Sequence, residues 1–268
     1  MMRIFLSVAI LFLASGAVAQ ELPPSMKELQ EIKGLSEKAL ESKDSLPLDI
    51  RKDALKEAAL SYGARGGLAW RTFQIREQLE QRSAYMDKIF DFRQLLIAAP
   101  SGLLMEPPII SESLDDLLIE TDGQTAAVSD AIYNISRNVR IVSTARNWRQ
   151  YLERTWGKVE EPPEILRPKN AEERAQWRIN VEKGWSEGIT QADEVFEQDL
   201  AALVADFNGM VRYRKLLAQG MVSPPFAQQV DRGVTGDGST LRVGDRAVAI
   251  TAVPQLLTGS DIWRPASQ

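Results

Sequence analysis

Residues 170–210 read NAEERAQWRINVEKGWSEGITQADEVFEQDLAALVADFNGM, and this stretch carries the strongest structural signal in the chain. Its apolar residues recur at spacings of three and four, the pattern of one face of an α-helix. They are Trp177, Val181, Trp185, Ile189, Ala192, Phe196, Leu200, Leu203, Phe207 and Met210. Asn170 is a favourable N-cap, and Glu173 three residues later completes a start that resembles a capping box. The stretch predicts one long amphipathic helix, or two helices with a kink near Gly184 or Gly188.

The region after this helix is of a different kind. The turn dipeptides Asp237-Gly238 and Gly244-Asp245 flank β-prone runs, among them AVAIT at 247–251, so we predict a β-hairpin. The glycines of 233–238 do not form a phosphate-binding loop, because no Lys-Ser/Thr follows them and no helix is predicted after them. The fold class is therefore α+β, predominantly helical, with a long helix in the C-terminal half and a small antiparallel β-hairpin region near the C-terminus.

Two further helices are predicted in the N-terminal half. The first spans 26–43, and the second begins near Leu48 and runs to Leu79. The second contains GARGG at 63–67, and each glycine costs a helix up to about 1 kcal/mol relative to alanine. Either the helix breaks at these glycines, or another backbone approaches so closely that only glycine fits.

The middle of the chain gives weaker signals. Pro100 and the prolines at 107–108 predict an extended connection, and residues 126–152 change from alternating to helical spacing. Pro162, Pro163 and Pro168 predict a linker near 160–169.

The N-terminus has the pattern of a cleavable secretory signal peptide over residues 1–19. Arg3 gives a positive start, residues 4–13 are an apolar run, and Ala17 and Ala19 form an A-x-A cleavage site before Gln20. The apolar run is too short for a permanent transmembrane helix. We therefore expect export, followed by an N-terminal lead and helix over 20–47 and a single domain over 48–268.

The composition excludes several kinds of chemistry. The chain has 268 residues with no cysteine and no histidine. Zinc sites built on these residues, cysteine nucleophiles and Ser-His-Asp triads are therefore excluded. The net charge of −5 and the lack of a cluster of basic residues argue against DNA binding through the phosphates. A carboxylate pair or a Ser-Lys arrangement remains for catalysis, so the composition makes an enzyme less expected.

A carboxylate-based enzyme is the alternative from another class. An exported protein with acids beside aromatic residues, such as Glu182 and Glu187 around Trp185, could be a peptidoglycan-cleaving glycosidase. Adjacent acids on a helix do not face each other, however, and most such pairs are solvated. Asp206 within an apolar helical stretch is more unusual, but pairing of a buried acid with Arg212 or Arg214 explains it as readily as catalysis does.

Four of the six tryptophans directly precede an arginine. These dipeptides begin at positions 70, 148, 177 and 263. Tryptophan and arginine are the residues most favoured at the energetic centres of protein interfaces. We therefore expect a partner interface that uses the following residues: Gly66, Trp70, Arg71, Trp148, Arg149 and Trp185.

The segment SYGARGGLAWR at 61–71 resembles the signature of the DotC family of type IVB secretion components, whose plasmid counterpart is the TraI protein of IncI-type conjugative plasmids. Further segments resemble the family in the same order. They are EPPII at 106–110, WRQYL at 148–152, GWSEGITQA at 184–192, DFNGM at 206–210, GVTGDG at 233–238, and the dipeptides at 245–246 and 250–251.

The resemblance implies a structural subunit of the outer-membrane core complex that is not an enzyme and has no cofactor. Such a protein acts with a small DotD-type lipoprotein to place a secretin-like DotH-type partner at the outer membrane, and the family provides no catalytic residues. Family members are typically lipoproteins with a lipidated cysteine, whereas this chain has Gln20 at that position. We therefore expect a non-acylated periplasmic protein that reaches the outer membrane through its partners.

Overall fold

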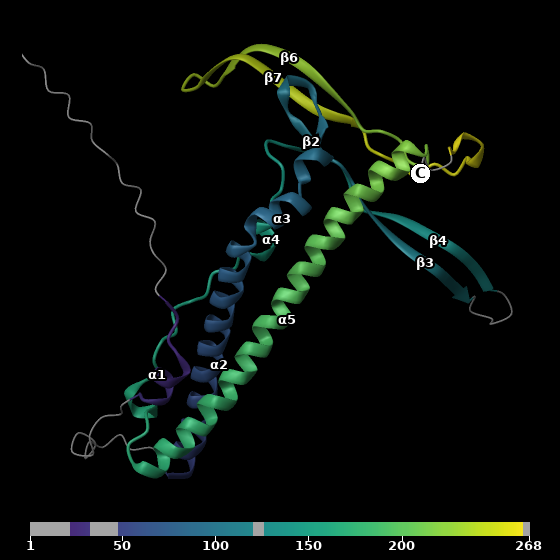
Figure 1. Ribbon diagram of the computed structural model, residues 1–268. Helices are drawn as coiled ribbons and strands as arrows, with labels where there is room; N and C mark the ends of the chain where they lie inside the picture. The colour runs from purple at the N-terminus through teal and green to yellow at the C-terminus, as the bar shows by residue number, and fades with distance from the viewer. Residues whose placement is uncertain (1–21, 33–47, 120–125, 265–268) are drawn as a thin grey trace, which may run out of the picture.

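The computed structural model describes residues 22–32, 48–119 and 126–264, and two long helices form its frame (Figure 1). Helix α2 is Leu48–Gln81 and helix α5 is Ala171–Ala218. They run parallel to each other, since Arg51 pairs with Glu173 near one end and Arg71 pairs with Asp193 further along. The predicted helix at 170–210 is confirmed as one uninterrupted helix, capped by the Asn170 side chain.

The contact between the two helices explains their glycines. A β carbon on Gly63 would lie 3.0 Å from the Trp185 backbone nitrogen, and one on Gly184 would lie 3.0 Å from the Ala64 nitrogen. Gly67 and Gly188, each one turn further along its helix, are equally close to the opposite backbone. Of the two alternatives in the sequence, close approach is therefore the one adopted, and α2 continues through the glycines.

The N-terminal segment packs onto this frame. Helix α1 is Met26–Gln30 and begins with a capping box between Ser25 and Glu28. Leu29 is fully buried, and its carbonyl accepts a hydrogen bond from the Trp177 indole nitrogen at 3.0 Å. The predicted helix over 26–43 was wrong in its extent where it can be compared, because α1 ends at Gln30; residues 33–47 lie outside the described part.

Short elements follow α2 and cover the far end of the frame. They are α3 (Ser83–Ile89), η2 (Phe92–Leu95), β1 (Ile97–Ala98), η3 (Pro100–Gly102), β2 (Leu104–Glu106), β5 (Arg140–Val142) and α4 (Arg149–Leu152). Strands β1, β2 and β5 form a small antiparallel sheet in that order. Phe92, Trp148, Leu203 and Met210 are among the residues of the buried core beneath them.

A long hairpin, β3 (Ile109–Ile119) with β4 (Ala126–Arg137), projects from the frame near the C-terminal part of α5 (Figure 1). The sequence placed an extended connection before Ile110 and alternation after residue 126, but it did not predict this hairpin. Leu114 and Val128 are largely exposed. Apolar residues of both strands thus face solvent, which obscures the one-sided pattern by which a half-buried strand is recognised.

The chain then returns along the helices. Residues 153–163 contain no regular structure, and η4 (Glu164–Leu166) follows. The Arg51 side chain of α2 donates hydrogen bonds to the carbonyl oxygens of Ile165 and Arg167. The Pro-rich segment predicted as a linker is thus fastened to the start of α2.

The C-terminal region forms a second hairpin, β6 (Phe226–Gly236) with β7 (Leu241–Ala252), which confirms the predicted hairpin; η5 (Ser260–Ile262) comes after it. Asp237 closes the turn, because its carboxylate accepts hydrogen bonds from the backbone nitrogens of Ser239 and Thr240. The dipeptide at 244–245 is not a turn: Gly244, with φ of 70°, lies inside β7 at a shift of register.

The mixed architecture confirms the predicted α+β class. No helix within the described ranges is long and apolar enough to cross a membrane. The proposed signal cleavage residues, Ala17, Ala19 and Gln20, lie outside the described residues.

Candidate functional site

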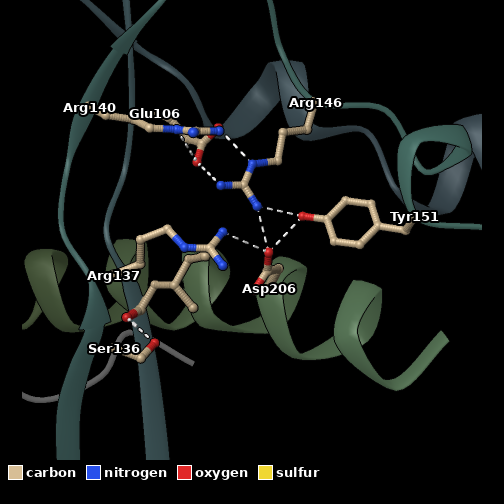
Figure 2. Close-up of polar contacts among 8 residues, drawn as sticks. Glu106, Ser136, Arg137, Arg140, Arg146, Tyr151 and Asp206 are labelled. Carbon is tan, nitrogen blue, oxygen red and sulfur yellow. Dashed lines mark hydrogen bonds and ion pairs between the residues drawn. The ribbon is translucent and has the colours of Figure 1, made fainter. Parts of the chain in front are cut away.

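A network of arginines and acids lies where the β3–β4 hairpin meets the frame (Figure 2). At its centre, Arg146 donates hydrogen bonds to both carboxylate oxygens of Glu106 and one to Asp206. The Nε–Oε2 distance to Glu106 is 2.8 Å. Arg140 reaches Glu106 from the opposite side at 3.1 Å, and Arg137 reaches Asp206 at 3.1 Å.

The network joins elements that are distant in sequence. Glu106 ends β2, Arg137 ends β4 and Arg140 begins β5, whereas Asp206 projects from the C-terminal part of α5. Glu106 is only 2% exposed. A buried carboxylate is tolerated only when it is paired and fully hydrogen-bonded, and the two arginines on Glu106 meet this requirement. The network therefore fixes the root of the hairpin to α5.

Tyr151 of α4 completes the cluster. Its hydroxyl donates to Asp206 at 2.7 Å and accepts from Arg146. Burial, together with the hydrogen bond to Asp206, raises the pKa of Tyr151 to about 12. Burial opposes the charged form of Arg146, but hydrogen bonds to Glu106 and Tyr151 outweigh this and raise its pKa. Both groups therefore remain protonated at physiological pH and stay hydrogen-bond donors to the carboxylates.

The predicted partners of Asp206 were wrong. Arg212 instead pairs with Glu112 of β3 at 2.9 Å, and it also donates to the Ile110 carbonyl. Arg214 donates to the carbonyl oxygens of Leu95 and Leu96. Neighbours on one helix were the only candidates visible in the sequence, whereas the real partners arrive from β4 and the segment after β5.

Three of the predicted interface residues meet at the contact between the helices. Gly66 faces Leu29 and the Trp185 ring, and a β carbon there would lie 3.1 Å from that ring. The rings of Trp70 and Trp185 lie 6.3 Å apart, tilted at 41°. Arg71, the fourth residue of this group, is paired with Asp193 of α5 at 2.6 Å.

The other two predicted residues lie at the junction of α3 and α4. Trp148 is 1% exposed, and its indole nitrogen donates to Asp87 at 2.7 Å. The Arg149 guanidinium lies 4.3 Å from the centre of the Trp148 ring and pairs with Asp87 and Glu153. All six residues thus make contacts within the chain, and their contact with a partner stays a prediction.

A cavity of about 390 Å³ lies between the two long helices and the returning segment. Its lining includes the apolar residues Ile75, Ala192 and Phe196 and the basic residues Arg154 and Lys158. Arg154 is already paired with Asp199 at 2.8 Å. Among the described residues, no group of three or more acids is placed to hold a metal ion.

The β6–β7 hairpin carries the most exposed apolar side chains near the C-terminus. They are Phe226, Val230, Val234, Leu241 and Val243, which are between 56% and 78% exposed. Apart from its root, the hairpin touches the rest of the molecule chiefly at η3, where the Ser101 hydroxyl donates to the Gln229 side chain. These side chains form an exposed apolar surface on the hairpin.

Comparison with known families gives one finding that bears on this architecture. The family described as "type IV secretory system, conjugal DNA-protein transfer" matches residues 49–265. No curated protein matches the chain. The matched range includes α5, α2 apart from its first residue, both hairpins and the arginine–acid network.

Proposed function

This chain belongs to the type IV secretory family of conjugal DNA-protein transfer, and from that premise we propose that it is a DotC-like structural subunit of a type IVB apparatus. In this role it helps to place or hold a secretin-like DotH-type partner at the outer membrane, together with a small DotD-type lipoprotein. The protein acts by binding other subunits and carries out no reaction.

One observation carries this proposal: the segments that resemble the DotC family contact one another in pairs. The first and fourth segments, at 61–71 and 184–192, supply the glycines of the contact between the helices. The segments at 106–110 and 206–210 meet in the arginine–acid network through Glu106 and Asp206. Gly209 also lies directly beneath Ile109 and Ile110. The family pattern therefore corresponds to the contacts that build this frame.

The architecture is suited to assembly. A frame of parallel helices, stiffened by direct backbone contact, supports two hairpins that extend away from it (Figure 1). Exposed apolar side chains on a projecting hairpin are typical of surfaces that a partner covers. Such a subunit can bridge neighbours without a binding pocket for a small substrate.

We place the protein in the periplasm, associated with the outer membrane. Export depends on the N-terminal signal, and no cysteine is present to receive a lipid. Attachment to the membrane then comes from the secretin-like subunit and the lipoprotein.

Membrane fractionation tests the proposal. The protein is produced in cells with and without the secretin-like partner, and the inner and outer membranes are separated on a density gradient. We expect it in the outer-membrane fraction only when the partner is present. An outer-membrane location independent of both partners contradicts the proposal. So does cell-wall clearing in a zymogram that one Glu→Gln substitution abolishes, since the glycosidase would then replace the structural subunit.

A further inference from the structure

The two strands of the β6–β7 hairpin each have an unpaired edge. Within the described residues the hairpin is a two-stranded sheet, so each strand has one strand neighbour and one open side. A two-stranded hairpin alone is at best marginally stable in water. Its open edges present unsatisfied backbone donors and acceptors, which natural proteins protect with charges, prolines or bulges.

The part of the hairpin nearest its root lacks this protection. Residues 227–230 pair in regular register with 247–250, and neither segment contains a charge, a proline or a glycine. The bulges lie outside it, at 226–227 and around Gly233. The side chain of Val230, which lies opposite Ala247, is 56% exposed. A strand added here would find a regular, uncharged edge.

The charges at the end of this segment indicate which strand fits. Asp231 of β6 lies opposite Arg246 of β7, with 3.5 Å between their charged groups. Arg232 lies 4.0 Å from Asp245 of β7. The two strands thus carry opposite charges at matching positions, and the whole hairpin has three aspartates and three arginines. The open edge of β6 is therefore complementary to the open edge of a second β7.

We propose that the hairpins of neighbouring copies of this chain pair edge to edge, with β7 of one copy lying antiparallel to β6 of the next. The register is the one seen inside the hairpin, so that Gln228 lies opposite Ala249 of the neighbour. The contact is head-to-tail, because each copy offers one β6 edge and one β7 edge, and such contacts build rings or filaments. This inference deepens the proposed function, and rests on it, by naming a second copy of the chain as one partner.

Cysteine cross-linking tests the register directly, since the natural chain contains no cysteine. Two single variants, Gln228→Cys and Ala249→Cys, are purified, mixed and mildly oxidised. Residues directly opposite on antiparallel strands lie close enough for a disulfide. We expect linked dimers in the mixture, several-fold above either variant alone. Ser186→Cys, on the exposed face of α5, mixed with each variant is the matched control.

A charge exchange separates contacts between copies from contacts within one hairpin. The double variant Asp231→Arg/Arg246→Asp keeps each hairpin complementary to itself. Combined with the cysteines, it is expected to cross-link normally with its own kind, and several-fold less with chains of natural charge at low salt.

Three results overturn the inference. Cross-linking of the mixture no higher than the Ser186→Cys control, in both the purified protein and intact cells, contradicts it. Dimers of Gln228→Cys alone that exceed those of the mixture indicate pairing of β6 with β6. Equal cross-linking of matched and exchanged charges contradicts the proposed register, in which Asp231 lies opposite Arg246 of the neighbouring copy. Any of these leaves the fractionation result untouched, so the failure of this inference and the failure of the proposed function are distinguishable.

Discussion

Replacing Gly184 with alanine tests whether the two long helices touch through their backbones. At a free position inside a helix, alanine is more favourable than glycine by about 1 kcal/mol. Here the new β carbon would lie 2.9 Å from the Leu60 carbonyl carbon and 3.0 Å from the Ala64 nitrogen. These are atoms of a helix backbone, which cannot rotate away as a side chain can.

The expected loss of stability follows from these opposing effects. Overpacking a close contact costs about 1–3 kcal/mol, and the upper end applies because a whole helix must shift. After the gain in helix propensity is subtracted, the free energy of unfolding falls by about 2 kcal/mol. In a domain of this size, that lowers the melting temperature by about 4–8 °C.

Urea unfolding of the mature protein, followed by circular dichroism, measures the change. Two controls accompany it: Ser186→Ala, exposed on the same helix, is expected to be neutral or slightly stabilising, and Gly157→Ala, with nothing near its added carbon, is expected to be neutral. If Gly184→Ala raises the free energy of unfolding by about 1 kcal/mol, as in a free helix, the argument from backbone contact is refuted.

Three further substitutions test the core and the charged contacts. Within the described residues, the buried hydroxyl of Tyr213 is the side-chain polar group without a hydrogen-bond partner. Tyr213→Phe is therefore expected to leave the free energy of unfolding in urea unchanged or to raise it by about 1 kcal/mol. A loss of stability would reveal a partner. Arg146→Gln leaves Glu106 and Asp206 without the arginine that both of them bind, so the free energy of unfolding should fall by about 3 kcal/mol. An unchanged free energy would show that the network does not hold the hairpin. Glu173→Gln tests a pH dependence: burial opposes ionisation, but hydrogen bonds from an arginine and a backbone nitrogen outweigh it and lower the carboxyl pKa. The carboxylate therefore stabilises the fold above its unfolded pKa, and the advantage of the natural protein over Glu173→Gln should disappear as the pH falls through and below about 4; an advantage that grows in acid would contradict the assignment.

The sequence predicted those elements whose signal is local. The helix at 170–210 has a long run of apolar residues at helical spacing, and the turn of the C-terminal hairpin has an Asp-Gly dipeptide. The β3–β4 hairpin was missed although the dipeptide Asp122-Gly123 stands between its strands, because no clearly one-sided apolar alternation flanks that dipeptide. Its strands are held by pairing between residues such as Ser111 and Asn134, and such pairing leaves no trace in either strand alone.

The arginine–acid network could not be assembled from the sequence for a related reason. Glu106 and Asp206 are far apart in the chain, and Arg146 belongs to neither element that it joins. The sequence marked Asp206 as unusual because it interrupts an apolar stretch. Its true partners required the chain path after β4, which no periodicity predicts.

The parallel orientation of the long helices determines where this network lies. With 48 residues, α5 spans about 72 Å, whereas the 34 residues of α2 span about 51 Å. Because Arg51 is level with Glu173 and Arg71 with Asp193, the two helices start together, and the last turns of α5 have no neighbour in α2. Asp206, Gly209 and Arg212 lie on these turns, and β3 packs there instead. The hairpin is thus fixed to the part of α5 that extends beyond α2, so it would move with α5 if the two helices shifted against each other.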